Sequence, residues 1–254
     1  MIKTGTLEAG MAARKFFDMD KQPGGHNQGL AWRTEIIEGD RATGSGPQAF
    51  LVEQGPDSLT GVHFHTEHQF QVIVAGSGTL GRQEVAPYIV HYAAGHTGYG
   101  PIKAGAEGLS YLTVRAVPDF APPYYLPDMR AEMKPLRKVN RHSEQAPAQD
   151  EAARQARAAI TCDVLLPPSD AAAWLLRVPP GQVAPVPVHA DCGGQFRVVV
   201  GGSMVIDSQE LRHLGCAWVD AAECGLPVVA GAEGLDVLVL QFPAGIWAAQ
   251  PAVQ

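Results

Sequence analysis

The sequence is poor in positive charge, in long apolar runs and in signals for export. Its 19 Lys and Arg stand against 26 Asp and Glu, for a net charge of −7. No basic stripe is therefore available to neutralise phosphates, which argues against a nucleic-acid-binding groove. No run approaches the ~20 apolar residues of a membrane span, and residues 1–17 lack the apolar core of a secretory signal. We expect a cytoplasmic protein with neither a nucleic-acid nor a membrane partner.

Cysteine is scarce as well. Four cysteines occur in 254 residues, all in the second half and none at CxxC spacing: Cys162, Cys192, Cys216 and Cys224. This pattern indicates neither a zinc knuckle nor a disulfide framework, and we expect the protein to be reduced.

Glycine and proline, in contrast, are abundant. The 28 Gly and 20 Pro separate short apolar segments that have the length of strands, at 32–37, 48–53, 70–74, 78–82, 88–92 and 109–117. Short strands at this spacing, with no amphipathic helix among them, indicate an antiparallel sandwich or barrel. A helix is expected only within 148–160, where acidic residues precede arginines in agreement with the helix dipole.

The second half of the chain repeats the first. When His63 is set against His189, an offset of 126 residues (189 − 63), Gln69 meets Gln195, and the segments 104–109 and 230–235 both read AGAEGL. These matches in one register indicate a tandem duplication of one β domain. We expect domains over 1–121 and 158–254, joined over 122–157 by a linker with a short helix. The glycines of the repeated segment are expected to form a tight turn.

His63 and His65 lie two residues apart in a segment of extended character. Side chains alternate between the two faces of a strand, so both imidazoles should point to the same face. Two neutral imidazoles side by side are a natural start for a transition-metal site. Gln69 lies further along this face and could add an oxygen donor. Residues 70–74 then continue as a buried strand, and 75–78 are expected to form a turn.

His-x-His followed by Gln four residues later and Gly seven beyond that resembles the first motif of the cupin superfamily. The residues here are His63, His65, Gln69 and Gly76, and a recognisable second motif falls in 92–101. The resemblance covers nearly all of both halves. It implies a bicupin: an all-β chain of two tandem cupin (double-stranded β-helix, jelly-roll) barrels with a divalent transition metal (Fe, Mn, Ni or Zn) inside the first.

The chain departs from the cupin pattern at two positions. Metal-binding cupins typically use three His and one Glu, but Gln69 stands in place of the Glu. A neutral donor leaves more positive charge on the metal, which makes it a stronger Lewis acid that binds less tightly. The third His is missing near residues 98–99. Four residues are candidates to replace it: His96, Tyr99, His91 and Glu67.

From this resemblance we expect four metal ligands and one catalytic residue in the first barrel. The ligands are His63, His65, Gln69 and His96, and Tyr99 lines the site as a proton donor. In the second half the equivalent positions hold His189, Asp191 and Gln195, and its second motif offers no His. We therefore expect a degenerate barrel kept for packing, with Cys192 and Cys224 as small apolar fillers.

Two functions are consistent with these residues. The first is a metal-dependent cupin enzyme, an oxygenase, lyase or isomerase, that acts on a small organic acid or carbonyl compound. The alternative is a non-catalytic small-molecule-binding or storage-like bicupin. The fold alone does not choose between them. A monomer and a homodimer are both compatible with the sequence.

Overall fold

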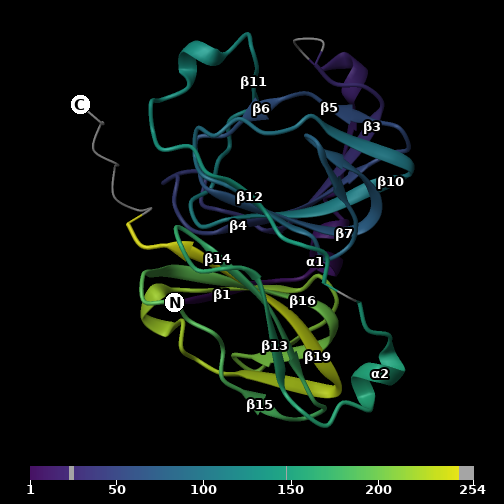
Figure 1. Ribbon diagram of the computed structural model, residues 1–254, viewed down its shortest axis with the longest axis vertical. Coiled ribbons are helices and arrows are strands. Elements are labelled where there is room, and N and C mark those ends of the chain that lie inside the picture. The colour runs from purple at the N-terminus through teal and green to yellow at the C-terminus, as the bar shows by residue number, and fades with distance from the viewer. Residues whose placement is uncertain (23–25, 147, 246–254) are drawn as a thin grey trace. The chain divides into compact units, whose positions relative to one another are not determined.

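The computed structural model describes residues 1–22, 26–146 and 148–245 (Figure 1). These residues form mostly strands, with two short α-helices, α1 (Leu7–Met11) and α2 (Glu151–Gln155). The described residues divide into two compact units: Met11–Gln145, named barrel N here, and Met1–Gly10 with 146–245, named barrel C. Each unit contains one large antiparallel sheet, and the two sheets are consistent with the expected jelly-roll barrels.

Barrel N is built around the long strands β7 and β10, which pair along most of their length. The main strand order is β12-β9-β7-β10-β4-β3-β2, with β5 added to β10 and β8 to β7, while β6 pairs with β11. The strands are β2 (Lys15–Asp18), β3 (Leu30–Ile37), β4 (Gln48–Gln54), β5 (Leu59–Thr60), β6 (His63–Phe64), β7 (Gln69–Leu80), β8 (Gln83–Val85), β9 (Val90–Ala93), β10 (Ile102–Arg115), β11 (Tyr124–Tyr125) and β12 (Asn140–His142).

Barrel C has the same arrangement around β16 and β19. Its order is β1-β18-β16-β19-β14-β13, with β15 added to β19 and β17 to β16. The strands are β1 (Ile2–Gly5), β13 (Thr161–Leu166), β14 (Ala172–Val178), β15 (Val183–Ala184), β16 (Cys192–Ile206), β17 (Gln209–Leu211), β18 (Cys216–Val219) and β19 (Val228–Pro243). Three short 3-10 helices complete the described elements of the chain: η1 (Met19–Lys21), η2 (Arg130–Glu132) and η3 (Ala221–Glu223).

The repeated AGAEGL segment lies within strands β10 and β19, not in a tight turn as predicted. Gly108 has a positive φ of 83° at an irregularity of the β7–β10 pairing, and its carbonyl packs against Gly76. Gly202 and Gly234 repeat this contact in barrel C. A Cβ on Gly76 or Gly202 would collide with the facing carbonyl, so both barrels require glycine here for one shared β-bulge. Residues 75–78 accordingly continue strand β7 and do not turn.

The domain boundaries differ from the expected ones at both ends of barrel N. Strand β1, expected in the first domain, pairs with β18 in barrel C. The segment 122–145, expected to be a linker, belongs to barrel N, where β11 pairs with β6 and β12 with β9. These short strands carry no apolar alternation, so they look like linker in the sequence. The predicted helix is present as α2, begun by the Asp150 side chain, which accepts from the Ala153 N–H.

Cys192 and Cys224 form a disulfide, which corrects the expectation of a fully reduced chain. The two cysteines are 32 positions apart in the sequence, and this spacing gave no signal, because it is the fold that brings the start of β16 to the end of η3. Cys162 and Cys216 are free thiols. No helix in the described part of the chain is long and apolar enough to cross a membrane.

Candidate active site

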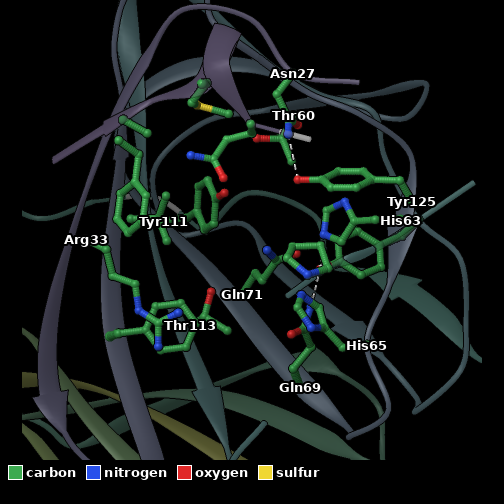
Figure 2. Close-up of a pocket in the computed structure, with 18 of the residues that line it drawn as sticks. Asn27, Arg33, Thr60, His63, His65, Gln69, Gln71, Tyr111, Thr113 and Tyr125 are labelled. Atoms are coloured by element: carbon green, nitrogen blue, oxygen red, sulfur yellow. Dashed lines mark hydrogen bonds between the residues drawn. The ribbon is translucent and has the colours of Figure 1, made fainter. Parts of the chain in front are cut away.

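Barrel N encloses a cavity of about 200 Å³ between β3, β4, β7 and β10 and the loops at their ends (Figure 2). Aromatic rings and polar side chains share its wall. The polar and aromatic residues include Arg33, Phe50, Thr60, His63, His65, Gln69, Gln71, Tyr99, Tyr111, Thr113, Arg115 and Tyr125. A concave site with apolar walls and a few convergent polar groups is the usual form of a small-molecule site.

His63 and His65 both face this cavity, as their spacing predicted. Phe64 between them points to the opposite side, where its ring stacks on Tyr124 with centroids 4.9 Å apart. The imidazole centroids of His63 and His65 are 5.3 Å apart and nearly perpendicular. The alternation of side chains along an extended segment therefore produces the pair.

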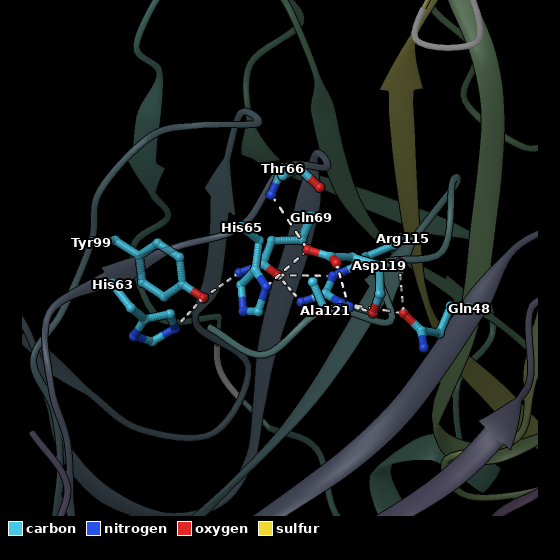
Figure 3. Close-up of polar contacts among 9 residues, drawn as sticks. All are labelled: Gln48, His63, His65, Thr66, Gln69, Tyr99, Arg115, Asp119 and Ala121. Atoms are coloured by element: carbon cyan, nitrogen blue, oxygen red, sulfur yellow. Dashed lines mark hydrogen bonds and ion pairs between the residues drawn. The ribbon is translucent and has the colours of Figure 1, made fainter. Parts of the chain in front are cut away.

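Tyr99 is placed beside His63 by the backbone. The two residues form an antiparallel bridge in which each N–H donates to the other's carbonyl, at 3.1 and 3.0 Å. Directly opposed residues of such a pair put their side chains on the same face. The Tyr99 hydroxyl consequently lies 2.8 Å from His63 Nε2 (Figure 3).

The hydrogen bonds of the two histidines indicate their tautomers. His63 Nδ1 donates to the Gly61 carbonyl at 2.7 Å, which leaves Nε2 to accept the proton of the Tyr99 hydroxyl. His65 Nδ1 donates to Asp119 Oδ2 at 3.1 Å, which leaves its Nε2 lone pair for the cavity. Burial lowers the pKa of His63 to about 4. Burial and the nearby Arg115 also lower the pKa of His65, so both rings are neutral at neutral pH.

Gln69 holds the Tyr99 hydroxyl from the other side and does not present its oxygen to the cavity. Gln69 Nε2 donates to Tyr99 Oη at 2.6 Å. Its Oε1 accepts from Arg115 Nε and Nη2, at 3.1 and 2.9 Å. The buried guanidinium thus occupies the oxygen that was expected to bind a metal, and Gln69 turns its N–H toward Tyr99.

Arg115 and Asp119 lie on the far side of Gln69 and His65 from Tyr99 and hold both side chains by hydrogen bonds (Figure 3). Arg115 Nη1 donates to Gln48 Oε1 at 3.2 Å and to the Asp119 carbonyl at 3.0 Å. Burial raises the pKa of the Asp119 carboxyl, but the hydrogen bond from His65 and the charge of Arg115 outweigh it and lower this pKa overall. Burial raises the pKa of Tyr99 well above its ordinary range, although the positive charge of Arg115 lowers it in part.

The other predicted ligand, His96, is not brought to the cavity. Its ring packs at 5.5 Å from Phe64, and Phe64 points away from His63 and His65. His96 Nδ1 accepts from the Lys134 N–H at 3.3 Å. The cause is the positive φ of 57° at His96, which turns the chain before Tyr99.

Two further candidates for the third ligand lie outside the cavity wall. His91 is buried behind it, with Nδ1 on Gln71 Oε1 at 2.8 Å and Nε2 on Asn140 Oδ1 at 2.9 Å. Glu67 lies in the turn after His65 and does not line the cavity. Of the four candidates to replace the missing third His, only Tyr99 lines the cavity, where its hydroxyl contacts His63.

The spacing of the two histidines fits a pair of ligands of one metal ion. Two imidazoles bound through Nε2 at about 2.1 Å and at angles of 90 to 110° would have centroids roughly 4.6 to 5.3 Å apart. The observed 5.3 Å agrees with this spacing. Each Nδ1 is anchored by a carbonyl or carboxylate, the usual support of a metal-binding His. No group of three or more His, Cys, Asp and Glu in the described residues could hold a metal, so any third ligand is of another type.

The equivalent positions of barrel C hold no such site. Gln241 is bonded to the backbone of His189 in both directions, at 2.9 and 3.0 Å. Gln195 Nε2 donates to the Pro187 carbonyl at 2.9 Å and to Gln241 Oε1 at 3.3 Å. Asp191 is exposed. These amides tie the chain together at the place where barrel N has its histidines.

Sequence reasoning missed Arg115, Asp119 and Tyr125. Arg115 ends a strand whose other residues are mostly apolar, and a lone Arg at a strand end usually lies on the surface. Asp119 lies at the expected end of the first domain, and Tyr125 lies in the segment 122–157 that was expected to be a linker. The pairing of Tyr125 with His63 in the β11–β6 ribbon carries no local sequence signal.

Comparison with known proteins identifies the fold. No family model matches the sequence, and no curated protein matches it either. A structure of a Bacillus subtilis oxalate decarboxylase mutant is similar to 90% of this chain and 76% of its own, with a TM-score of 0.56 at 12% identity. A structure of a Nostoc punctiforme protein described as a candidate dioxygenase is similar over 95% of this chain and 86% of its own, with a TM-score of 0.55 at 14% identity.

Both of these proteins are cupins, and the decarboxylase has Mn(II) centres. At 12 to 14% identity the likeness concerns the fold. The chain thus has the fold of cupin-type proteins, as the His-x-His motif implied.

Proposed function

We propose that barrel N binds a divalent transition metal at His63 and His65 and acts on a small organic acid or carbonyl compound in the adjoining cavity. The observation that carries the proposal is the pair of neutral imidazoles that line one cavity with ring centroids 5.3 Å apart, each with its Nδ1 anchored. When bound, the metal would supply Lewis acidity to polarise an oxygen of the substrate.

Neighbouring residues orient His63 and His65 and keep them in the form that binds a metal. The Gly61 carbonyl and the Asp119 carboxylate fix the rings of His63 and His65 and raise their strength as ligands. Burial keeps both imidazoles unprotonated at neutral pH, the form that a metal requires. Tyr99, the residue predicted from the motif to be catalytic, has its hydroxyl beside His63.

The far wall of the cavity favours an anionic group. Figure 2 shows Arg33 and Thr113 across the cavity from His63 and His65. The Arg33 guanidinium stacks on the Phe50 ring at 3.6 Å and is tethered to Glu35 at 2.6 Å, so its direction is fixed before a ligand arrives. A small organic acid could place its carboxylate toward Arg33 and its second oxygen toward the histidines, since guanidinium groups match carboxylates in shape and charge.

Metal content tests the proposal. Protein purified without chelator, and protein then treated with Fe(II), Mn(II) or Zn(II), should hold about one metal ion per chain. Binding should raise the melting temperature, since an ion at 100 times its Kd contributes about 2.7 kcal/mol. His63→Ala and His65→Ala should each lose the metal and this stabilisation.

Two other histidines provide matched controls. His96→Ala and His189→Ala should keep one metal per chain, because both side chains lie away from the cavity. Absence of metal from the unmodified protein under every loading condition would contradict the proposal. So would loss of metal in the His96 variant but not in the His63 variant.

A second candidate function, metal-free binding of a small molecule, is favoured by one observation. Without a metal, the Tyr99 hydroxyl already donates to His63 Nε2, and Gln69 Oε1 already accepts two hydrogen bonds from Arg115. A binder of this kind would be stabilised by organic acids in the presence of a chelator, without turnover, and the same acids would stabilise His63→Ala.

A further inference from the structure

We propose that Tyr99 is the third protein ligand of the metal in barrel N, bound through its phenolate oxygen and positioned by Gln69 and Arg115. This inference rests on the metal binding proposed above. It gives one explanation for both departures from the cupin pattern: Gln69 in place of Glu, and Tyr99 in place of His.

The position of the hydroxyl fits a ligand of the same ion as His63. Two ligands at about 2.1 and 2.0 Å from a metal, at a right angle to each other, are about 2.9 Å apart. Tyr99 Oη lies 2.8 Å from His63 Nε2. The backbone bridge between the two residues holds this spacing. The two atoms are therefore already at the spacing of two ligands of one ion.

Among the described residues, His63 Nε2 is the acceptor of the Tyr99 proton, and a metal on His63 would take that acceptor away. The hydroxyl has two partners in the network: His63 Nε2, which accepts its proton, and Gln69 Nε2, which donates to its oxygen. The metal would take the lone pair of Nε2, and a buried hydroxyl without an acceptor is costly. The O–H bond would then break, with its proton passing to bulk water, and the electron pair left on the oxygen would be free to bind the metal.

Gln69 suits a phenolate in a way that Glu would not. Its N–H donates to the Tyr99 oxygen at 2.6 Å and so supports negative charge there. Arg115 fixes the amide in this orientation through two hydrogen bonds to Oε1. A carboxylate at position 69 would offer no N–H and would add a like charge beside the phenolate.

The exchange also preserves the charge of the ligand set. The usual cupin set of three His and one Glu has one anion among neutral imidazoles. Two His and a phenolate likewise have one anion, moved from the Glu position to the place of the third His. The substitutions at 69 and 99 are thus complementary, and a metal held by them would keep the net charge of an ordinary cupin centre.

A visible spectrum tests the assignment. The protein is loaded with Fe(II), one iron per chain is verified, and the iron is oxidised with hexacyanoferrate. A phenolate bound to Fe(III) gives a charge-transfer band in the visible range, so the unmodified protein should be coloured. Tyr99→Phe should lose this band and bind metal at least tenfold more weakly, while Tyr111→Phe and Tyr125→Phe, which alter other tyrosines of the same cavity, should keep both.

A double variant tests the movement of charge. Adding Gln69→Glu to Tyr99→Phe returns the anion to the usual cupin position, and this pair should recover most of the lost affinity without recovering the colour. Resonance Raman spectra of the unmodified iron protein should show phenolate vibrations, a measurement that depends on no variant.

The outcomes separate the two proposals. If the unmodified protein holds no metal under any condition, both fall. If it holds one iron per chain without a charge-transfer band, or if Tyr99→Phe keeps the band, Tyr99 is not a ligand, while metal binding at His63 and His65 stands.

Discussion

Barrel N keeps a polar cavity at the place where barrel C is packed with aliphatic side chains. At the offset of 126 residues, Tyr111 and Thr113 of the cavity wall correspond to Val237 and Val239, which belong to the apolar core of barrel C. Tyr99 corresponds to Gly225. Both copies share the bulge glycines and the strand order, so the scaffold is independent of the site.

The two barrels also differ in how they treat a buried arginine. Arg115 makes four hydrogen bonds, to Gln69, Gln48 and the Asp119 carbonyl, with the Asp119 carboxylate nearby as a countercharge. Arg197 is fully buried in barrel C and donates from Nη2 to the Cys224 carbonyl at 3.0 Å, while Nε and Nη1 have no partner among the described residues. Arg115 is thus part of a network, whereas Arg197 has one hydrogen bond to a carbonyl; other arginines of barrel C, such as Arg157, are paired with an aspartate.

Acid should produce the largest difference in stability between the two barrels, because the buried histidines of the described residues all lie in barrel N. Burial lowers the pKa of His63 to about 4 and of His91 to about 3, from 6.5. The unfolded chain then binds more protons than the folded one below pH 6.5, so stability is full above this pH and falls as the pH drops toward 4. Each histidine should cost about 3 kcal/mol by pH 4.

Two-dimensional NMR of the metal-free protein can follow this loss. Amide signals of 11–145 should lose their native dispersion between pH 6.5 and 4, while those of barrel C persist to lower pH. Simultaneous unfolding of the two barrels, or earlier unfolding of barrel C, would contradict this explanation.

Arg115→Gln should have the next largest effect. It gives barrel N the residue that barrel C has at the equivalent position, Gln241. The change removes the cation beside the buried Asp119 carboxylate. It takes the Arg115 donors from Gln69 Oε1 and the Asp119 carbonyl, and leaves Gln48 Oε1 with the Asp119 N–H alone. We expect barrel N to lose about 3 kcal/mol. Hydrogen exchange read separately over each barrel provides the measurement, with protection in barrel C as the internal control. A loss below about 1 kcal/mol would mean that the network contributes little.

Arg197→Met should have the smallest effect, and in the opposite direction. Burial lowers the pKa of Arg197 to about 10, which still leaves it charged at neutral pH. Replacing an unpaired buried cation by an apolar chain of similar length should leave barrel C unchanged or stabilise it by about 1 kcal/mol. The same exchange measurement applies. A loss as large as that from Arg115→Gln would reveal an anionic partner of Arg197.

The fold was accessible from the sequence because its signals are local or repeated. The alternation around His63 and His65, the strands bounded by glycine, and the single offset of 126 residues each follow from one rule applied to neighbouring positions. The strand assignments at Leu30–Ile37 and Gln48–Gln54 agree with the expected ones within two residues. The assignment of β1 and β11 failed because each pairs with a strand remote in sequence and has no pattern of its own.

The site was only partly accessible for the same physical reason. Alternation placed the two histidines, but the orientation of the Gln69 amide depends on Arg115, which lies 46 residues away. His96 was expected at the metal from its position in the motif, and one left-handed residue sends its ring to the other face. Tyr99 reaches His63 through a backbone bridge that no spacing rule describes.

Strand β1 makes barrel C discontinuous in the chain. Gly5 pairs with Cys216, a separation of 211 residues (216 − 5), and the whole of barrel N lies within the loop that this pairing closes. Barrel N is thus topologically an insertion into the sheet of barrel C. A cut between the two barrels would release a C-terminal fragment that lacks β1 and exposes the unpaired edge of β18, the kind of edge through which β proteins associate. Folding of barrel C has to wait for a contact between distant parts of the chain, whereas barrel N can form from one continuous segment.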